Sequence, residues 1–381
     1  MKRKVYGLVF AFGFVQSAFC QSAFTANPPQ PKSTFIVGTT WATERTHKAD
    51  GDMWPITWAA DGNMYGSAGD NQGSSMNFWR IEGNAGRHAV YLVDNQPFDP
   101  AVYCRGANVD KTRCMKPAGL LGLGGLLYYA VETMNYGDNP AFNRQHNING
   151  WIVPSRDFGK TWKMDATPTD FFAGRLASIH FVQFGQDYAG ARDAFVYADF
   201  PAADDGHSYW ENGDYLLLGR VPKDKILVRS AWEFYTGLNS SGQPLWSADD
   251  SKAEPMFRYN RMTGEDHITY NPALKRYFLG NYGFHNNLEP RPYHQYRGTP
   301  AAGPSTRCPS QLTLYEAPEP WGPWSLFYRD DNWGTCGDYQ PSFPPKWMST
   351  DGLTMWMVAA GSTDDYNFVT QRVTLTLGKG Q

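Results

Sequence analysis

The ten residues Ile56–Tyr65, which read ITWAADGNMY, contain two short apolar runs on either side of an Asp-Gly pair. Asp-Gly is a strong signal for the tight turn that joins two antiparallel strands, because such turns need residues that tolerate positive φ angles. The stretch therefore predicts a β-hairpin. Four other stretches have the same form of apolar run, turn and second apolar run, namely residues 119–128, 179–197, 268–277 and 346–356.

Further strand-like runs follow these hairpins. They are residues 77–82 and 89–94, 150–154 and 161–163, 215–221 and 232–237, 312–316 and 324–328, and a last run at 368–377. Units of four strands that repeat about every 60–75 residues are typical of propeller blades. The sequence thus predicts an all-β fold, a five-bladed β-propeller, with an early strand at residues 34–40 that completes the last blade. A β-sandwich with long loops is the alternative.

The composition fits a protein built from many short strands. Glycine and proline, at 38 and 26 of 381 residues, supply turns. Aromatic residues make up 15% of the chain, more than a core of aliphatic packing needs, so some are expected to line a cleft. The net charge of -3 gives no basic field for nucleic acid or an anionic membrane, and neither is expected as a partner.

The N-terminus has the form of a secretory signal peptide. Positive residues at positions 2–4 precede an apolar run over residues 5–19, and small residues stand before a cleavage position after Cys20. A lipid anchor on Cys20 is less favoured, because Phe19 stands where a small residue is wanted. The apolar run is short for a membrane span.

These features predict three regions. They are a signal peptide at residues 1–20, a linker at 21–33 and a single propeller domain at 34–381. We expect the mature protein to be secreted or periplasmic, with no membrane attachment after cleavage.

Four cysteines remain after cleavage, and an exported protein favours disulfides between them. Three connectivities are possible. Local pairing closes the shortest loops and is preferred over a zinc site, for which the spacing gives no support. The two expected pairs are Cys104 with Cys114 and Cys308 with Cys336.

Two aspartates flank the first hairpin. Asp52 precedes its first strand and Asp70 follows its second, so the hairpin brings both back to one end. Glycoside hydrolysis needs such a pair of carboxyl groups, one as acid and one as base or nucleophile. We predict Asp52 and Asp70 as the catalytic pair, with Trp54 and Trp58 as rings that stack on sugars. Asp and Gly are also ordinary turn residues, which is the structural alternative.

Other acids are candidates for substrate contact. Glu132 is expected to end an inner strand of the second blade. Tyr209 and Glu211 lie in a Tyr-Trp-Glu-Asn stretch before a predicted strand, and could form a sugar platform or supply a third acid. Each of them could instead be a solvated surface group.

Residues 155–162, SRDFGKTW, match the Asp-box pattern S-x-D-x-G-x-T-W. The match resembles the boxes of sialidases and other carbohydrate-active propellers. Such a box is a structural turn, in which the Asp side chain bonds the backbone and the Trp packs between hairpins. Asp157 is therefore not expected to be catalytic.

The order D-x-W-P-x-T-W from Asp52, D-G-N-x-Y from Asp61 and the later Gly69-Asp70 resembles the opening of five-bladed propeller glycosidases. The similarity is closest to the endo-D-arabinanase family, formerly a domain of unknown function, and includes the hairpin at residues 270–277. The resemblance implies that Asp52 and Asp70 are the catalytic acids. The family's usual G-D-T-F reads G-D-N-Q here.

Two other functions stay open. A lyase that cleaves a uronate-containing polysaccharide would use His, Tyr and Arg side chains, here His146 with Arg144, or His267 with Tyr270. A propeller that binds glycans without cleaving them is the third candidate. His146 and His267 count in any case as candidates for substrate contact. No cofactor is expected to be required, although a structural calcium ion in the centre of the propeller is considered.

Overall fold

The computed structural model describes residues 26–381, except for the following positions: 72–73, 107–108, 110, 112–113, 137–138, 140, 285–309, 335–337, 362–366 and 380–381. The predicted signal peptide and the pair Cys308–Cys336 lie outside the described residues. Within the predicted linker, Lys32 forms a bridge to Leu326.

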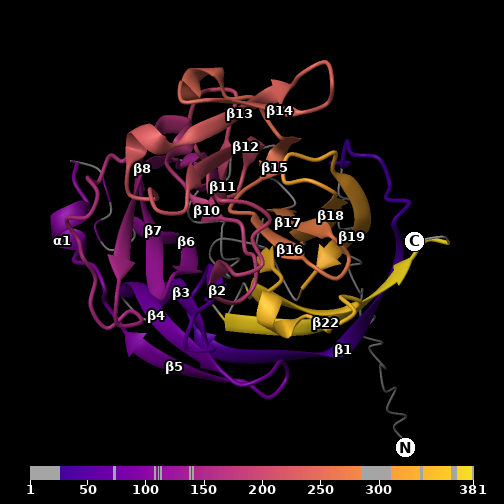
Figure 1. Ribbon diagram of the computed structural model, residues 1–381. Coiled ribbons are helices and arrows are strands. Elements are labelled where there is room, and N and C mark those ends of the chain that lie inside the picture. The colour runs from indigo at the N-terminus through magenta and orange to yellow at the C-terminus, as the bar shows by residue number, and fades with distance from the viewer. Residues whose placement is uncertain are drawn as a thin grey trace, which may run out of the picture.

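Five antiparallel sheets surround a common centre (Figure 1). The first holds β2 (Ile56–Trp58), β3 (Met64–Asn71), β4 (Ser74–Glu82) and β5 (Ala89–Asp94). The second holds β6 (Met115–Leu123), β7 (Leu126–Met134), β8 (Asn147–Ser155) and β9 (Phe172–Ala173). The third holds β10 (His180–Phe181), β11 (Phe195–Ala202), β12 (Gly213–Pro222), β13 (Glu233–Leu238) and β14 (Pro244–Ser247), with β15 (Phe257–Thr263) paired to β12.

The fourth sheet holds β16 (His267–Asn271), β17 (Arg276–Phe284), β18 (Ser310–Ala317) and β19 (Ser325–Trp333). The fifth holds β20 (Tyr339–Ser342), β21 (Thr354–Ala360), β22 (Asn367–Leu377) and β1 (Ile36–Asp50). The one α-helix among the described residues, α1 (Pro100–Tyr103), is a single turn. No helix in the part of the chain described is long and apolar enough to cross a membrane.

The two ends of the chain close the ring. Strand β1 pairs along its length with β22, so the first strand of the chain is the fourth strand of the last blade. The prediction of a five-bladed β-propeller closed by an early strand is confirmed. That strand runs to Asp50, ten residues beyond the predicted end.

Two predicted strands are placed differently. Residues 161–163 form no strand, because the Thr161 amide and hydroxyl both bond to Asp157 inside the preceding turn. In the fifth blade the inner strand is β20, ahead of the predicted hairpin at 346–356. Proline at 344 and 345 has no N–H for a strand ladder, and residues Pro345–Trp347 form a 3₁₀ turn instead.

Glycines allow neighbouring blades to approach closely near the centre. A Cβ on Gly119 of β6 would lie 2.3 Å from the Ile179 carbonyl oxygen, and one on Gly280 of β17 would lie 2.3 Å from that of Pro341. Any side chain at these positions would clash with the backbone of the next blade. These contacts set how closely neighbouring blades pack.

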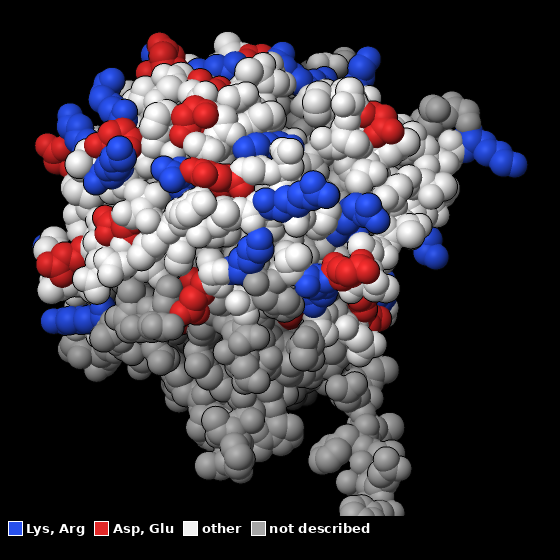
Figure 2. All heavy atoms as spheres, turned by 90° about the horizontal axis from the view of Figure 1, so that it is seen from below, with Lys and Arg blue, Asp and Glu red and all other residues white. Residues whose placement is uncertain are grey.

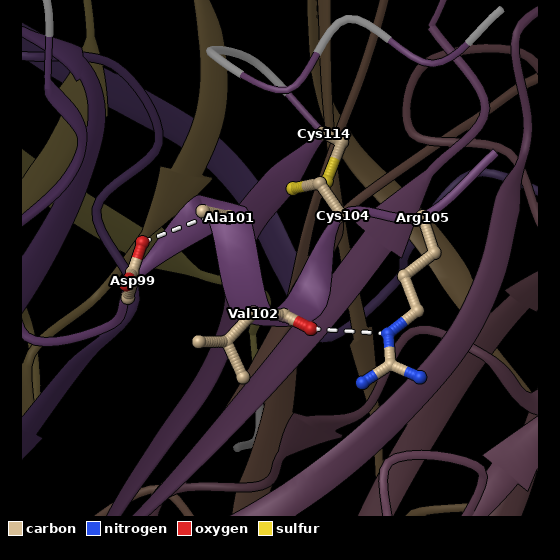
Figure 3. The surroundings of a disulfide bond; sticks show 6 residues. All are labelled: Asp99, Ala101, Val102, Cys104, Arg105 and Cys114. Atoms are coloured by element: carbon tan, nitrogen blue, oxygen red, sulfur yellow. Dashed lines mark hydrogen bonds between the residues drawn. A yellow bond between two sulfur atoms is a disulfide. The ribbon is translucent and has the colours of Figure 1, made fainter. Parts of the chain in front are cut away.

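A disulfide joins Cys104, which follows α1, to Cys114, which directly precedes β6 (Figure 3). The Cα atoms are 5.8 Å apart, and this predicted pair is confirmed. Asp99 caps α1 by accepting a hydrogen bond from the Ala101 amide, and the Arg105 side chain bonds the Val102 carbonyl. The bridge therefore anchors a small loop to the start of an inner strand.

Replacing both Cys104 and Cys114 by serine is expected to lower the free energy of unfolding by about 2–3 kcal/mol, because the unfolded chain then regains the freedom of a short closed loop. The midpoint of denaturant unfolding measures this. The wild-type protein treated with reductant should match the double variant, and an unchanged midpoint in both would contradict the expectation.

Candidate active site at the centre of the propeller

The five inner strands β2, β6, β10, β16 and β20 are the first strand of each blade. Successive blades repeat the same path outward, so all five strands begin at the same end of the propeller. Polar residues at or just before these starts therefore converge. Four of them, together with Asp70 and Glu132 near the ends of the second strands β3 and β7, form what we call the axial cluster: Asp52, Asp70, Lys116, Glu132, Glu265 and Gln340.

Asp52 and Asp70 lie in one site. Two backbone hydrogen bonds, from the Asp52 amide to the Gly69 carbonyl at 2.8 Å and back at 2.6 Å, hold the ends of the hairpin together. The Lys116 ammonium lies 2.6 Å from Asp70 Oδ1 and 3.6 Å from Asp52 Oδ1. The Lys116 side chain is 2% exposed, whereas those of Asp52 and Asp70 are 11% and 13% exposed. The two carboxylates thus reach solvent and the lysine lies behind them.

Sequence reasoning missed Lys116. Burial on its own would lower the pKa of this amine, but Asp52 and Asp70 raise it well above its usual value. The side chain is therefore a cation that holds both carboxylates. The sequence did contain a signal for this position. Lys116-Pro117 stands just before the second hairpin, as Trp54-Pro55 stands just before the first.

Behind Lys116 lies a pair of buried glutamates. Glu132 stands directly opposite Lys116 on β7, and its charge acts on Glu265, which precedes β16. Glu132 is 0% exposed and Glu265 1% exposed. Burial raises the pKa of Glu132 to about 7, and burial together with the charge of Glu132 raises that of Glu265 well above its usual value. Both side chains are therefore harder to ionise than an exposed glutamate.

Gln340 connects this pair to the first blade. Its Nε2 donates to Glu265 Oε2 at 2.7 Å, and its Oε1 accepts from the Trp54 amide at 2.8 Å. Trp54 is two residues from Asp52. Gln340 therefore links Glu265 to the segment of chain that holds Asp52.

The backbone is strained at three positions around the cluster. Met53, Asp70 and Gln340 have φ angles of 62°, 48° and 56°, in a region that side chains other than glycine seldom adopt. Such strain persists only where the surrounding contacts enforce it, and it concentrates at functional sites.

A Ser–His–Asp contact lies deeper in the centre. Ser178 Oγ is 2.9 Å from His180 Nε2, and His180 Nδ1 is 3.4 Å from Asp199 Oδ2. All three are 0% exposed. Burial lowers the pKa of His180 to about 3 and raises that of Asp199 well above its usual value. All three side chains are closed to substrate, so the contact is not a nucleophilic site.

Several predicted sugar contacts are wrong. Trp54 is 0% exposed and donates to the Gly51 carbonyl, so its ring cannot stack on a sugar. Trp58 lies at the other end of β2, where it pairs with Met64 next to the turn, whereas Asp52 pairs with Gly69 at the open end of the hairpin. Glu132 and Glu211 are 0% exposed, which leaves neither able to touch a sugar directly. Glu132 also lies on the second strand of its blade, not on the inner one.

His146 and Tyr209 come together with His207. The ring centroids are 4.2 Å apart for His146 and His207, and 6.1 Å apart for His146 and Tyr209. The Tyr209 hydroxyl donates to Asp205 Oδ2 at 2.8 Å. Burial, followed by the charge of Arg261, lowers the pKa of the neighbouring Arg144.

His267 and Tyr270 are not brought together. His267 begins β16, is 8% exposed, and has a pKa that burial and His180 lower well below its usual value. Tyr270 lies three residues further along the strand and packs on Tyr277 and Phe184. This arrangement contradicts the pairing considered for a lyase.

No metal centre is evident in the described residues. Among them, no group of three or more His, Cys, Asp or Glu side chains is arranged to hold a metal ion. On the face seen in Figure 2, basic and acidic side chains are interspersed.

The sequence matches no protein-family model and no curated protein. Solved structures do share its fold. A Bacteroides ovatus protein described as a hydrolase has a TM-score of 0.50 at 10% identity, over 87% of this chain and 87% of its own. The β-xylosidase RS223 has a TM-score of 0.50 at 10% identity, over 88% of this chain and 95% of its own. At such identity the likeness shows the fold alone, a propeller that takes up most of the chain.

Proposed function

We propose that the protein is a glycoside hydrolase that cleaves a polysaccharide or oligosaccharide with Asp52 and Asp70. The proposal rests on one observation. Two partly exposed carboxylates, Asp52 and Asp70, lie against the same buried ammonium of Lys116. The other two acids of the axial cluster, Glu132 and Glu265, are buried. The β-xylosidase with the same fold, a glycosidase by its name, supports this class of reaction.

The geometry favours different roles for the two aspartates. Asp70 lies nearest to the ammonium, which stabilises its negative charge as a nucleophile requires. Asp52 is further from Lys116 and is close enough to Glu265 for their charges to interact. In the proposed reaction Asp52 gives its proton to the glycosidic oxygen as that bond breaks, and Asp70 bonds to the sugar carbon. Asp52 then takes a proton from the water that releases the sugar.

The separation of the carboxylates predicts the stereochemistry. Because both lie against the same Nζ, their Oδ1 atoms are at most about 6.2 Å apart, a bound that includes the roughly 5–5.5 Å separation of the carboxyl groups in retaining enzymes. We expect the product to keep the anomeric configuration of the substrate. Proton NMR of the first product formed measures this, and the opposite anomer as first product would contradict the expectation.

A screen against plant, algal and bacterial-wall polysaccharides tests the reaction class. New reducing ends without new ultraviolet absorbance would support hydrolysis. Binding of a glycan without any product after long incubation would favour a non-catalytic propeller and contradict the proposal.

A lyase is the second candidate, because the contact of His146 with His207 and Tyr209 offers a base and an acid in one place. Lysis leaves a conjugated double bond in the product. Ultraviolet absorbance that appears with the reducing ends would favour the lyase over the hydrolase.

Export is a further part of the proposal, supported by the N-terminal sequence. N-terminal sequencing of protein recovered from the medium or periplasm tests it, with Gln21 expected as the first residue.

A further inference from the structure

A cavity lies beside the Asp-box turn at residues 155–162, away from the axial cluster. Its volume is about 440 Å³, within the roughly 300–1,000 Å³ that small-molecule sites occupy. The second blade and the Asp-box turn supply most of its wall, and Leu227, in the connection that follows β12 of the third blade, closes one side. The cavity therefore lies between two neighbouring blades.

The pairing of β7 with β8 brings the polar wall of this cavity together. Tyr128 stands opposite Pro154, so both side chains lie on the same face of the second sheet. Arg156, one residue past the end of β8, lines the same cavity. The Lys163 amide donates to the Pro154 carbonyl at 2.9 Å, which brings the chain back beside β8 after the turn. Two cations thus lie at one cavity.

These cations have no acidic partner. Within the described part of the chain, neither the Arg156 nor the Lys163 side chain forms a hydrogen bond or an ion pair. No acidic residue is among the described residues that line the cavity. The carboxylate of Asp157 is bonded inside the turn, where it accepts from the Ser155 hydroxyl at 2.8 Å and from the Thr161 amide and hydroxyl at 2.9 and 2.7 Å. The positive charge at the cavity is therefore available to a ligand.

Aromatic rings form the rest of the site. The centroid of the Trp162 ring is 5.0 Å from that of Phe78 in the first blade and 5.2 Å from that of Tyr129 in the second, so its position is fixed by the core. Trp162 and Tyr128 are both half-buried and both line the cavity. The C–H face of a sugar ring is apolar and packs well on such rings.

We propose that this cavity binds an acidic sugar unit of a glycan. Arg156 and Lys163 hold its anionic group, and Tyr128 and Trp162 contact the sugar ring. Arginine suits this task because its planar fork of N–H groups matches the oxygens of a bound anion. The anionic group is a carboxylate or a sulfate ester, since both present the same kind of acceptor to a cation.

This site is separate from the axial cluster. Tyr128 and Glu132 are four residues apart on β7, which is about 13 Å along a strand. Binding at the cavity therefore does not depend on the proposed hydrolysis. It would hold the protein on an acidic glycan while the axial cluster acts on another part of the chain.

Calorimetric titration tests the binding with three probes: trigalacturonate, a sulfated carrageenan oligosaccharide of similar length, and uncharged cellotriose. We expect at least one acidic probe to bind at least about tenfold more tightly than cellotriose, and the tighter of the two identifies the anion. Arg156→Gln and Lys163→Gln should each weaken this binding by about tenfold or more, because each removes a charged donor. Lys160→Gln is the matched control. Lys160 is an exposed lysine of the same turn that does not line the cavity, and its variant should bind as the wild type does.

Three outcomes of this titration would overturn the proposal. They are failure of both acidic probes to bind, binding of cellotriose as tight as that of the acidic probes, and a loss in Lys160→Gln as large as in Arg156→Gln. Inorganic sulfate that binds as tightly as the acidic probe would also overturn it, since the sugar ring would then contribute nothing.

Proton–nitrogen NMR locates the binding. The indole N–H signal of Trp162, assigned by its absence from Trp162→Phe, should shift on addition of the acidic probe. The same shift is expected in Asp70→Asn, because the axial cluster takes no part. Binding that Asp70→Asn abolishes and Arg156→Gln leaves intact would place the probe at the axial cluster and overturn the proposal. Absence of hydrolysis on every glycan would count against the proposed function alone.

Discussion

Replacing Asp52 or Asp70 by asparagine is expected to lower kcat by about 10³-fold or more while the protein stays folded. Asparagine has nearly the same shape, but it can neither donate the proton nor form the covalent bond that glycoside cleavage requires. Each variant removes one of the two counterions of Lys116 and keeps the other, so we expect some loss of stability but a folded protein. Initial rates of reducing-end release, with circular dichroism of each variant, measure the effect.

Exposed Asp224 supplies the control, and Asp224→Asn should leave kcat unchanged. A folded Asp52→Asn or Asp70→Asn variant with wild-type kcat would show that the carboxylates are not catalytic.

Replacing Lys116 by methionine is expected to reduce both activity and stability. Methionine fills much of the same volume without charge, and it leaves Asp52 and Asp70 facing each other with no cation. Breaking a buried ion pair by removing one partner costs about 3 kcal/mol or more. Because both aspartates are partly exposed, we expect this variant to lose close to the lower value of unfolding free energy. Denaturant unfolding at pH 7 measures the loss.

The pH dependence separates lost charge pairing from lost packing. Acid removes the charge of carboxylates, so the repulsion in the variant and the attraction to Lys116 in the wild type both fade, and the stability gap between the two should narrow as pH falls. Lys225→Met, at an exposed position, should be neutral at both pH values. A gap of the same size at pH 4 and pH 7 would assign the effect to packing and contradict the electrostatic role of Lys116.

Much of the fold follows from local signals in the sequence. The Asp61-Gly62 turn and its counterparts mark hairpins that the structure contains, and the apolar strand near residue 36 closes the ring as expected. The misplaced strands share a cause. At residues 161–163 side-chain hydrogen bonds to Asp157 compete with strand pairing, and in the fifth blade consecutive prolines break the run.

The candidate site is only partly predictable because most of its residues lie far apart in the sequence. Asp52 and Asp70 flank a single hairpin, so their proximity is a local property of the chain. Lys116, Glu265 and Gln340 come from three other blades, and no short-range pattern brings them together. The burial of Trp54 and Glu132 likewise depends on how the blades pack, which hydrophobic periodicity does not reveal.

The most direct test of the account compares binding with cleavage on the oligosaccharide that the screen identifies. Isothermal titration calorimetry and product analysis would be run on the wild type, Asp52→Asn and Asp70→Asn. We predict that the wild type cleaves the oligosaccharide, and that both variants bind it with similar affinity and release no reducing ends. If the wild type binds without cleaving, or if either variant cleaves as fast as the wild type, the Asp52–Lys116–Asp70 site is not the hydrolytic centre.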